Sequence, residues 1–97
     1  MALMNKSKHT TSGTVITGKA AFGGLLIGTD GANDPVVTVY DNTSNSGTEL
    51  IPTTTFDASA LGLNGAMIPH PIHCSTGIYV EITTGGTVEV TILFRQI

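Results

Sequence analysis

The residues best suited to hold a metal ion lie in one short segment of the chain. His70, His73 and Cys74 place two imidazoles and one thiol within five residues, and zinc prefers such ligands. In an extended strand, however, His70 and His73 point to opposite faces, as do the adjacent His73 and Cys74. We therefore favour a structural interpretation, in which Pro69 and Pro71 mark an edge strand and Cys74 is a small buried residue. No metal and no other cofactor is expected.

A second segment, residues 30–34, resembles a calcium-binding loop only superficially. It reads Asp-Gly-Ala-Asn-Asp and leads into Pro35, but the alternating oxygen ligands and the distal glutamate of an EF-hand are missing. A turn is the simpler interpretation. The sequence also lacks a Ser-His-Asp order with a nucleophile elbow, a phosphate-cradling glycine loop and a pair of catalytic carboxylates. These observations predict that the chain is not an enzyme.

Charged residues are few, and the basic ones gather near the beginning of the chain. Of the four basic residues, Lys6, Lys8 and Lys19 lie in the first nineteen positions, and all seven acidic residues follow them. We interpret residues 1–12 as a flexible basic arm, because chain ends are commonly mobile, and residues 13–97 as one β-sandwich domain. A sharper alternative is an arm that docks on an acidic neighbour.

The same composition bears on partners and compartment. An acidic body without clustered Lys or Arg argues against nucleic-acid binding. No apolar run approaches the roughly 20 residues needed to cross a bilayer, so no membrane partner is expected. A single cysteine cannot form an intrachain disulfide. We expect a soluble protein made in a cytoplasm.

Short apolar runs separated by turn residues make up most of the sequence. This pattern predicts an all-β fold, a single small β-sandwich or jelly-roll-like barrel of about seven or eight antiparallel strands. The candidate strands are residues 14–17, 20–28, 36–40, 49–56, 66–73, 78–83 and 88–94. The one helical hint lies at residues 57–62, where Asp57 could cap a short turn that Gly62 ends. A core of this size is modest, so oligomerisation would stabilise it.

The last two candidate strands, 78–83 and 88–94, allow a prediction of faces and register. In each, one alternating set of apolar residues faces the core and the other set faces solvent or a partner. Pairing them as a hairpin with matching faces requires a three-residue loop unless a bulge intervenes, and both 84–86 and 85–87 remain open. Tyr79 and Leu93 would then share the outward face, where a free monomer would carry polar groups. We therefore predict a subunit contact there.

Four segments in the middle of the chain share a further pattern. They are Thr29-Asp30-Gly31 with Asn33-Asp34-Pro35, the strand from Val36 to Asn42, the run from Gly47 to Pro52, and a closing run from Gly77 to Val80. Together they resemble small all-β proteins found among the virion structural proteins of tailed bacteriophages. The resemblance implies a β-sandwich or jelly-roll-like subunit, often trimeric, on the surface of a capsid or tail. It carries over no catalytic residue.

From this resemblance we expect a non-enzymatic bacteriophage virion structural protein, and most specifically a capsid decoration or cement protein. It would bind and stabilise the assembled shell as a symmetric oligomer. Its partners would be further copies of itself, in a trimer, and the major capsid protein or another virion protein. It would be made in the host cytoplasm and located in the virion. The candidate contact residues are Lys6, Lys8, Lys19, Tyr79 and Leu93.

Two alternatives belong to other functional classes. The first is a tail or fibre adaptor, or adhesion module, that binds a partner protein or a surface glycan. Its motivation is the polar loop of residues 42–47 together with an exposed Tyr40 or Tyr79. The more distant second is a small metal-dependent enzyme that uses His70, His73 and Cys74.

Overall fold

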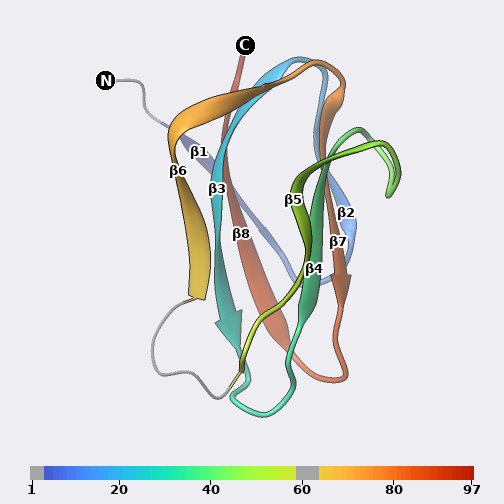
Figure 1. Cartoon of the computed structure of the whole chain (residues 1–97), viewed down its shortest axis with the longest axis vertical. Helices are drawn as coiled ribbons and strands as arrows, with labels where there is room; N and C mark the ends of the chain where they lie inside the picture. Colours follow the sequence, from blue (N-terminus) through green and yellow to red (C-terminus); the bar gives the residue numbers. More distant parts are fainter. Residues whose placement is uncertain (1–3, 59–63) are drawn as a thin grey trace.

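The computed structural model describes residues 4–58 and 64–97, with only the backbone described over residues 64–70. The described residues form eight strands in two four-stranded antiparallel sheets that pack as a β-sandwich (Figure 1). The first sheet, in spatial order, contains β1 (Asn5–His9), β8 (Val88–Gln96), β3 (Ala20–Thr29) and β6 (Asn64–Cys74). The second contains β2 (Gly13–Thr17), β7 (Gly77–Thr83), β4 (Val36–Asp41) and β5 (Thr48–Thr55). The predicted all-β sandwich is confirmed.

Hydrophobic alternation located the strands well. All seven candidate strands are present, and their ends differ from the predicted ones by no more than two residues. The segment with Pro69 and Pro71 is the edge strand β6, as predicted. Proline has no backbone N–H to donate to a neighbouring strand, so it fits a strand that has no partner on one side. The short helical turn expected at residues 57–62 falls for the most part on residues 59–63, which lie outside the described residues.

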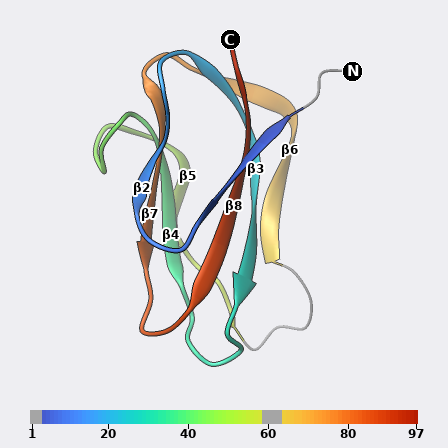
Figure 2. The same cartoon turned by 180° about the vertical axis from the view of Figure 1, so that it is seen from behind.

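The beginning of the chain differs from the flexible arm expected over residues 1–12. Residues 5–9 form β1, which pairs antiparallel with β8 from Asn5 opposite Phe94 to His9 opposite Val90 (Figure 2). The segment is too polar to show a core-facing pattern, but an edge strand is held chiefly by backbone pairing, which leaves no trace in side-chain hydropathy. The segment that leads from β1 to β2 in the other sheet is held by Ser12, whose hydroxyl accepts a hydrogen bond from the backbone N–H of Ile82 on β7 at 2.8 Å.

The predicted hairpin of the last two strands is wrong. In the structure β7 lies between β2 and β4, whereas β8 lies between β1 and β3, so the loop of residues 84–87 crosses from one sheet to the other. Tyr79 and Leu93 consequently do not share a face. Both strands carry one apolar side, and such a side fits the core equally well from either sheet, so alternation could not decide between a hairpin and a crossover.

The core lies between the two sheets, and most of it comes from the two central strands of each sheet, β8 and β3 in the first and β7 and β4 in the second. Its fully buried side chains of larger size are Phe22, Leu25, Ile27, Val37, Val39, Ile78, Val80, Val88, Val90 and Ile92. A bulge at Gly23 shifts the register of β3, so that Phe22 opposes Phe94 and Gly24 opposes Leu93. This extra residue lets Phe22 and Leu25 both face the core although they are three positions apart.

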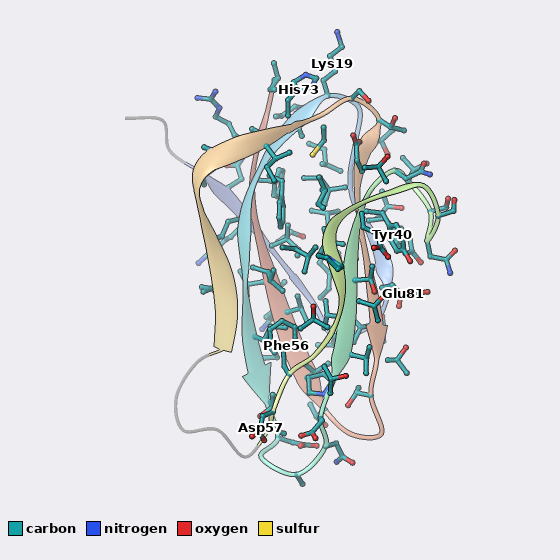
Figure 3. The ribbon with its side chains drawn as sticks, viewed as in Figure 1. Lys19, Tyr40, Phe56, Asp57, His73 and Glu81 are labelled. Atoms are coloured by element: carbon teal, nitrogen blue, oxygen red, sulfur yellow. The ribbon has the colours of Figure 1, made fainter. Side chains whose placement is uncertain are left out.

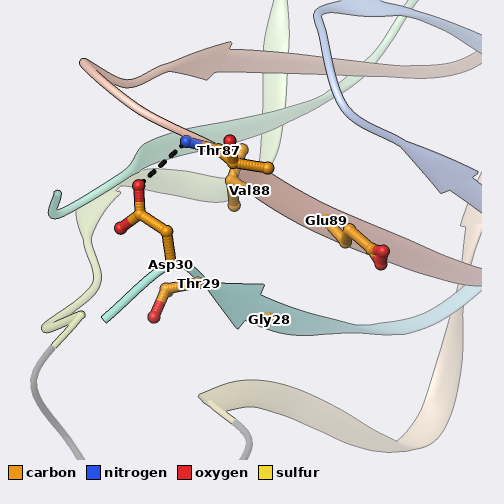
Figure 4. Close-up of a pocket in the computed structure, with 6 residues that line it drawn as sticks. All are labelled: Gly28, Thr29, Asp30, Thr87, Val88 and Glu89. Carbon is orange, nitrogen blue, oxygen red and sulfur yellow. Dashed lines mark hydrogen bonds between the residues drawn. The ribbon is translucent and has the colours of Figure 1, made fainter. Parts of the chain in front are cut away.

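Two aspartates hold the loops at the two ends of the sandwich. Asp30 accepts hydrogen bonds from the backbone N–H groups of Ala32 and Asn33, each at 2.9 Å. Its second carboxylate oxygen accepts the N–H of Thr87 at 3.0 Å, across to the β7–β8 crossover (Figure 4). At the opposite end the Asp41 carboxylate accepts backbone N–H groups of the β6–β7 crossover, residues 75–77. These bonds attach the loops at both ends of the sandwich to the strands that carry the outer faces.

Candidate protein-binding faces

The outer face of β1 and β8 gathers basic residues around a leucine. Lys6 pairs with Leu93, and Lys8 pairs with Thr91. All four point outward, because the residues of β8 that alternate with them, including Ile92, are buried in the core. Lys6, Lys8 and Thr91 line a shallow hollow on this surface. We call Lys6, Lys8, Thr91, Leu93 and the next outward residue of β8, Arg95, the basic face.

Most of the positive charge of the basic face is available to a partner. The Lys8 ammonium lies 3.6 Å from the Glu89 carboxylate, and the two side chains are 62 % and 50 % exposed. An ion pair this exposed contributes little stability. Among the described residues, Lys8 is the one basic residue in an ion pair, so no described side chain neutralises the charges of Lys6 and Arg95.

The outer face of the second sheet has the opposite character. Tyr40 of β4 and Tyr79 of β7 are direct partners across the strands, and Tyr40 is flanked on its other side by Glu49 of β5. Both tyrosines are half-buried, and they point away from the core because they alternate with buried residues, Val39 on β4 and Ile78 and Val80 on β7. Tyr40 and Glu81 lie together on this side of the sandwich (Figure 3). We call Tyr40, Tyr79, Glu49 and Glu81, with Asn45, the tyrosine face.

Hydrogen bonds fix the Glu81 carboxylate at the centre of this face. Its Oε2 accepts a bond from the Asn45 side-chain amide at 2.8 Å, and its Oε1 accepts the Tyr40 hydroxyl at 3.5 Å. Asn45 belongs to the polar loop of residues 42–47, so its bond to Glu81 attaches this loop to the outer face of β7. Partial burial, followed by the negative charges of Glu81 and Glu49, raises the pKa of Tyr40. The phenol therefore stays protonated and in a negative electrostatic field at neutral pH.

The structure brings some of the predicted contact residues together and separates others. Lys6, Lys8 and Leu93 share the basic face, whereas Tyr79 lies on the tyrosine face of the other sheet. Lys19 lies in neither face. It occupies the turn between β2 and β3, at the end of the sandwich (Figure 3), where its backbone carbonyl accepts the N–H of Ile97 at 3.2 Å.

The metal-like segment does not converge in the part that the structure describes. Cys74 is completely buried, whereas the adjacent His73 is exposed, and the side chain of His70 lies outside the described ones. Burial and the charge of Asp41 raise the pKa of the Cys74 thiol to about 11, which disfavours the thiolate that would bind a metal. Within the described residues, no group of three or more His, Cys, Asp or Glu side chains could hold a metal ion.

Several residues of the two faces were not predicted as contacts. Glu81 and Arg95 alternate with the core residues of their strands in the same way as Tyr79 and Leu93, so this signal was present in the sequence. Asn45 and Glu49 had no such signal, because their positions depend on how the loop and β5 pack against β4.

Comparison with protein-family models, with curated proteins and with solved structures gave no match. Within the described residues, no helix is long and apolar enough to span a membrane. The interpretation of the two faces therefore depends on their own chemistry and on the resemblance in the sequence.

Proposed function

We propose that this chain is a non-enzymatic structural subunit of a tailed-bacteriophage virion, a decoration or cement protein that binds the assembled shell and stabilises it as a symmetric oligomer. The observation that carries the proposal is the pair of chemically opposite outer faces on one sandwich. Such a subunit can contact the shell or a neighbouring copy with each face. The resemblance of segments within residues 28–65, and of residues 77–80, to small virion proteins supports placing it on a phage particle, made in the host cytoplasm and assembled into the virion.

The physical basis of cementing is simple. A subunit that binds the assembled shell but not its separated parts stabilises the shell by mass action. A symmetric oligomer, a trimer by the resemblance, would make several weak contacts at once and gain avidity from them. To bind a shell in this way a subunit needs contact surfaces with a defined shape. Both faces here lie on paired strands, and the loops at the ends of the sandwich are held by Asp30 and Asp41.

The proposal is tested with empty capsids assembled from the major capsid protein encoded in the same genome. Purified chain is mixed with the capsids, which are then sedimented, and the bound copies are counted per particle. We expect saturable binding and a higher temperature of shell disassembly. A denatured sample of the chain serves as the control for non-specific adsorption. If the chain binds neither heads nor tails of the cognate phage, the proposal is refuted.

The tyrosine face also supports a second candidate function, that of a tail or fibre module that binds a surface glycan. Paired tyrosines beside a fixed carboxylate and an amide supply the stacking surface and polar groups that sugar binding uses. A glycan array is the measurement. We expect a signal that Tyr79→Ala abolishes and that Lys19→Ala, a change outside both faces, preserves. The absence of any signal from the folded protein would dispose of this candidate.

A further inference from the structure

We propose that the tyrosine face of one copy binds the basic face of a second copy, in a head-to-tail contact. The inference rests on the oligomeric part of the proposed function and specifies which surfaces meet. The occupant of each face is therefore another molecule of this same chain.

Basic residues are confined to the first sheet and the turn that leads into it, where the strands also carry one acidic residue, Glu89 of β8, paired with Lys8. Among the basic residues, Lys6 and Lys8 lie on β1, Arg95 lies on β8, and Lys19 lies in the turn that leads into β3. The strands of the second sheet contain no Lys or Arg, but they contain three acidic residues, Asp41, Glu49 and Glu81. Asp41 is occupied by the backbone N–H groups of residues 75–77. Glu49 and Glu81 can therefore pair with a cation, and that cation must come from outside the strands of the second sheet.

The tyrosine face has the chemistry to bind that cation. A guanidinium or ammonium group is attracted to the face of an aromatic ring. Here Tyr40 and Tyr79 lie side by side, with the Glu49 carboxylate opposite Tyr40 on β5 and the Glu81 carboxylate two residues from Tyr79 along β7. Glu81 is already oriented by Asn45, so little conformational entropy is lost when it is bound. Arg95 suits this site best, because its planar fork can both stack on a ring and pair with a carboxylate.

The apolar residues of the two faces complete the match. Leu93 lies beside Lys6 on the basic face, and Tyr79 lies beside Tyr40 on the tyrosine face. Leu93 and Tyr79 are each half-buried in the isolated chain. Contact between the two faces would cover these two residues and leave the charged residues around them, which is the usual arrangement of an apolar centre and a polar rim.

Electrostatics favours a head-to-tail contact over a twofold one. A twofold dimer joins identical surfaces, so it would place lysines against lysines or glutamates against glutamates, and such like-charge contacts are costly. Joining unlike faces pairs opposite charges. A head-to-tail contact either closes into a ring or continues as an open stack, and the solution mass distinguishes the two.

The test uses two charge reversals whose faces complement each other. Glu81→Lys alters only the tyrosine face, and Arg95→Glu alters only the basic face. We expect each variant alone to associate at least roughly tenfold more weakly than the wild type at low ionic strength. An equimolar mixture should associate again, because the intact basic face of the first variant meets the intact tyrosine face of the second. The readout is mass by light scattering after size-exclusion chromatography.

Two further variants guard the interpretation. Lys19→Glu makes the same charge change outside both faces and should associate like the wild type. Glu49→Lys repeats the reversal at an exposed residue without a hydrogen bond to the loop, in case Glu81→Lys disturbs folding, which circular dichroism will show. A wild-type chain that stays monomeric at every concentration overturns the inference. Association that neither reversal weakens, or that mixing does not restore, overturns it as well.

These outcomes are separate from those of the proposed function. A monomer that binds capsids would overturn the head-to-tail contact together with the oligomeric part of the proposed function, and would leave shell binding intact. An oligomer with the expected charge dependence that binds neither heads nor tails would do the reverse. A monomer whose glycan-array signal needs Tyr79 would assign the tyrosine face to a sugar and overturn the contact between copies.

Discussion

Replacing Asp41 with alanine should destabilise the sandwich strongly, although the residue is only half-buried. Its carboxylate accepts the backbone N–H groups of Ser75 at 3.2 Å and of Thr76 at 3.1 Å, with a longer contact of 3.4 Å from Gly77. These bonds hold the crossover that carries the chain from β6 in the first sheet to β7 in the second. Asp41 therefore couples three elements through one side chain.

The magnitude follows from the number and exposure of these bonds. Removing a hydrogen bond to a charged group lowers the free energy of unfolding by about 1.5–3 kcal/mol. Ser75 and Thr76 are exposed, so water can replace part of what is lost, and we expect a decrease of about 2 kcal/mol in the free energy of unfolding for Asp41→Ala. Asp41→Asn keeps the shape and one acceptor, so its effect should be about half as large.

Equilibrium unfolding in urea measures the effect. With a slope of about 1 kcal/mol per molar urea for a domain of this size, Asp41→Ala should lower the midpoint by about 2 M. The slope itself should stay unchanged, and all variants are compared at one protein concentration because association would shift the midpoint. Glu89→Gln, which removes an exposed ion pair, is the control and should change stability by less than about 0.5 kcal/mol. An Asp41→Ala midpoint equal to that of the control would refute the reasoning.

Three further outcomes follow from the core and from the titrating groups. Ile92→Ala leaves a cavity between the sheets and should cost about 3 kcal/mol in thermal or urea unfolding; a loss below about 1 kcal/mol would contradict its burial. Burial lowers the pKa of His9, so His9 is protonated at a higher pH in the unfolded chain than in the folded one. The free energy of unfolding should therefore have its full value above the ordinary pKa of 6.5 and decrease as the pH falls below it. This slope should be reduced in His9→Gln, and an identical pH profile for that variant would exclude His9 as its source. Because the Cys74 thiol is buried and its pKa is raised to about 11, the native protein should resist iodoacetamide at pH 8 and react once unfolded; rapid alkylation of the folded protein would be inconsistent with this structure.

Local pattern was sufficient to find seven of the eight strands but not to assign them to sheets. The alternation of Ile78 and Val80, or of Val90 and Ile92, shows which side of a strand faces the core. It does not show which sheet the strand joins, because either sheet offers the same apolar environment. For that reason Tyr79 and Leu93 were each recognised as outward-facing apolar residues, while their shared face was an error of topology.

Features that depend on backbone contacts between distant segments left little trace in the sequence. β1 is polar and is defined by its pairing with β8, and Asp41 acts on a turn more than 30 positions away. The bulge at Gly23 was equally hidden, although Phe22 and Leu25 could not both be buried without one. The tyrosine face needed the loop of Asn45 to be placed before its charge centre at Glu81 could be recognised.

The measurement that tests the two-faced subunit most directly is the solution mass of the wild-type chain, by size-exclusion chromatography with light scattering over a range of protein and salt concentrations. We expect a mass well above the 10.0 kDa of one chain at low ionic strength, decreasing as salt screens the opposite charges of the faces. A mass of one chain at every concentration, at low as well as high salt, would contradict it.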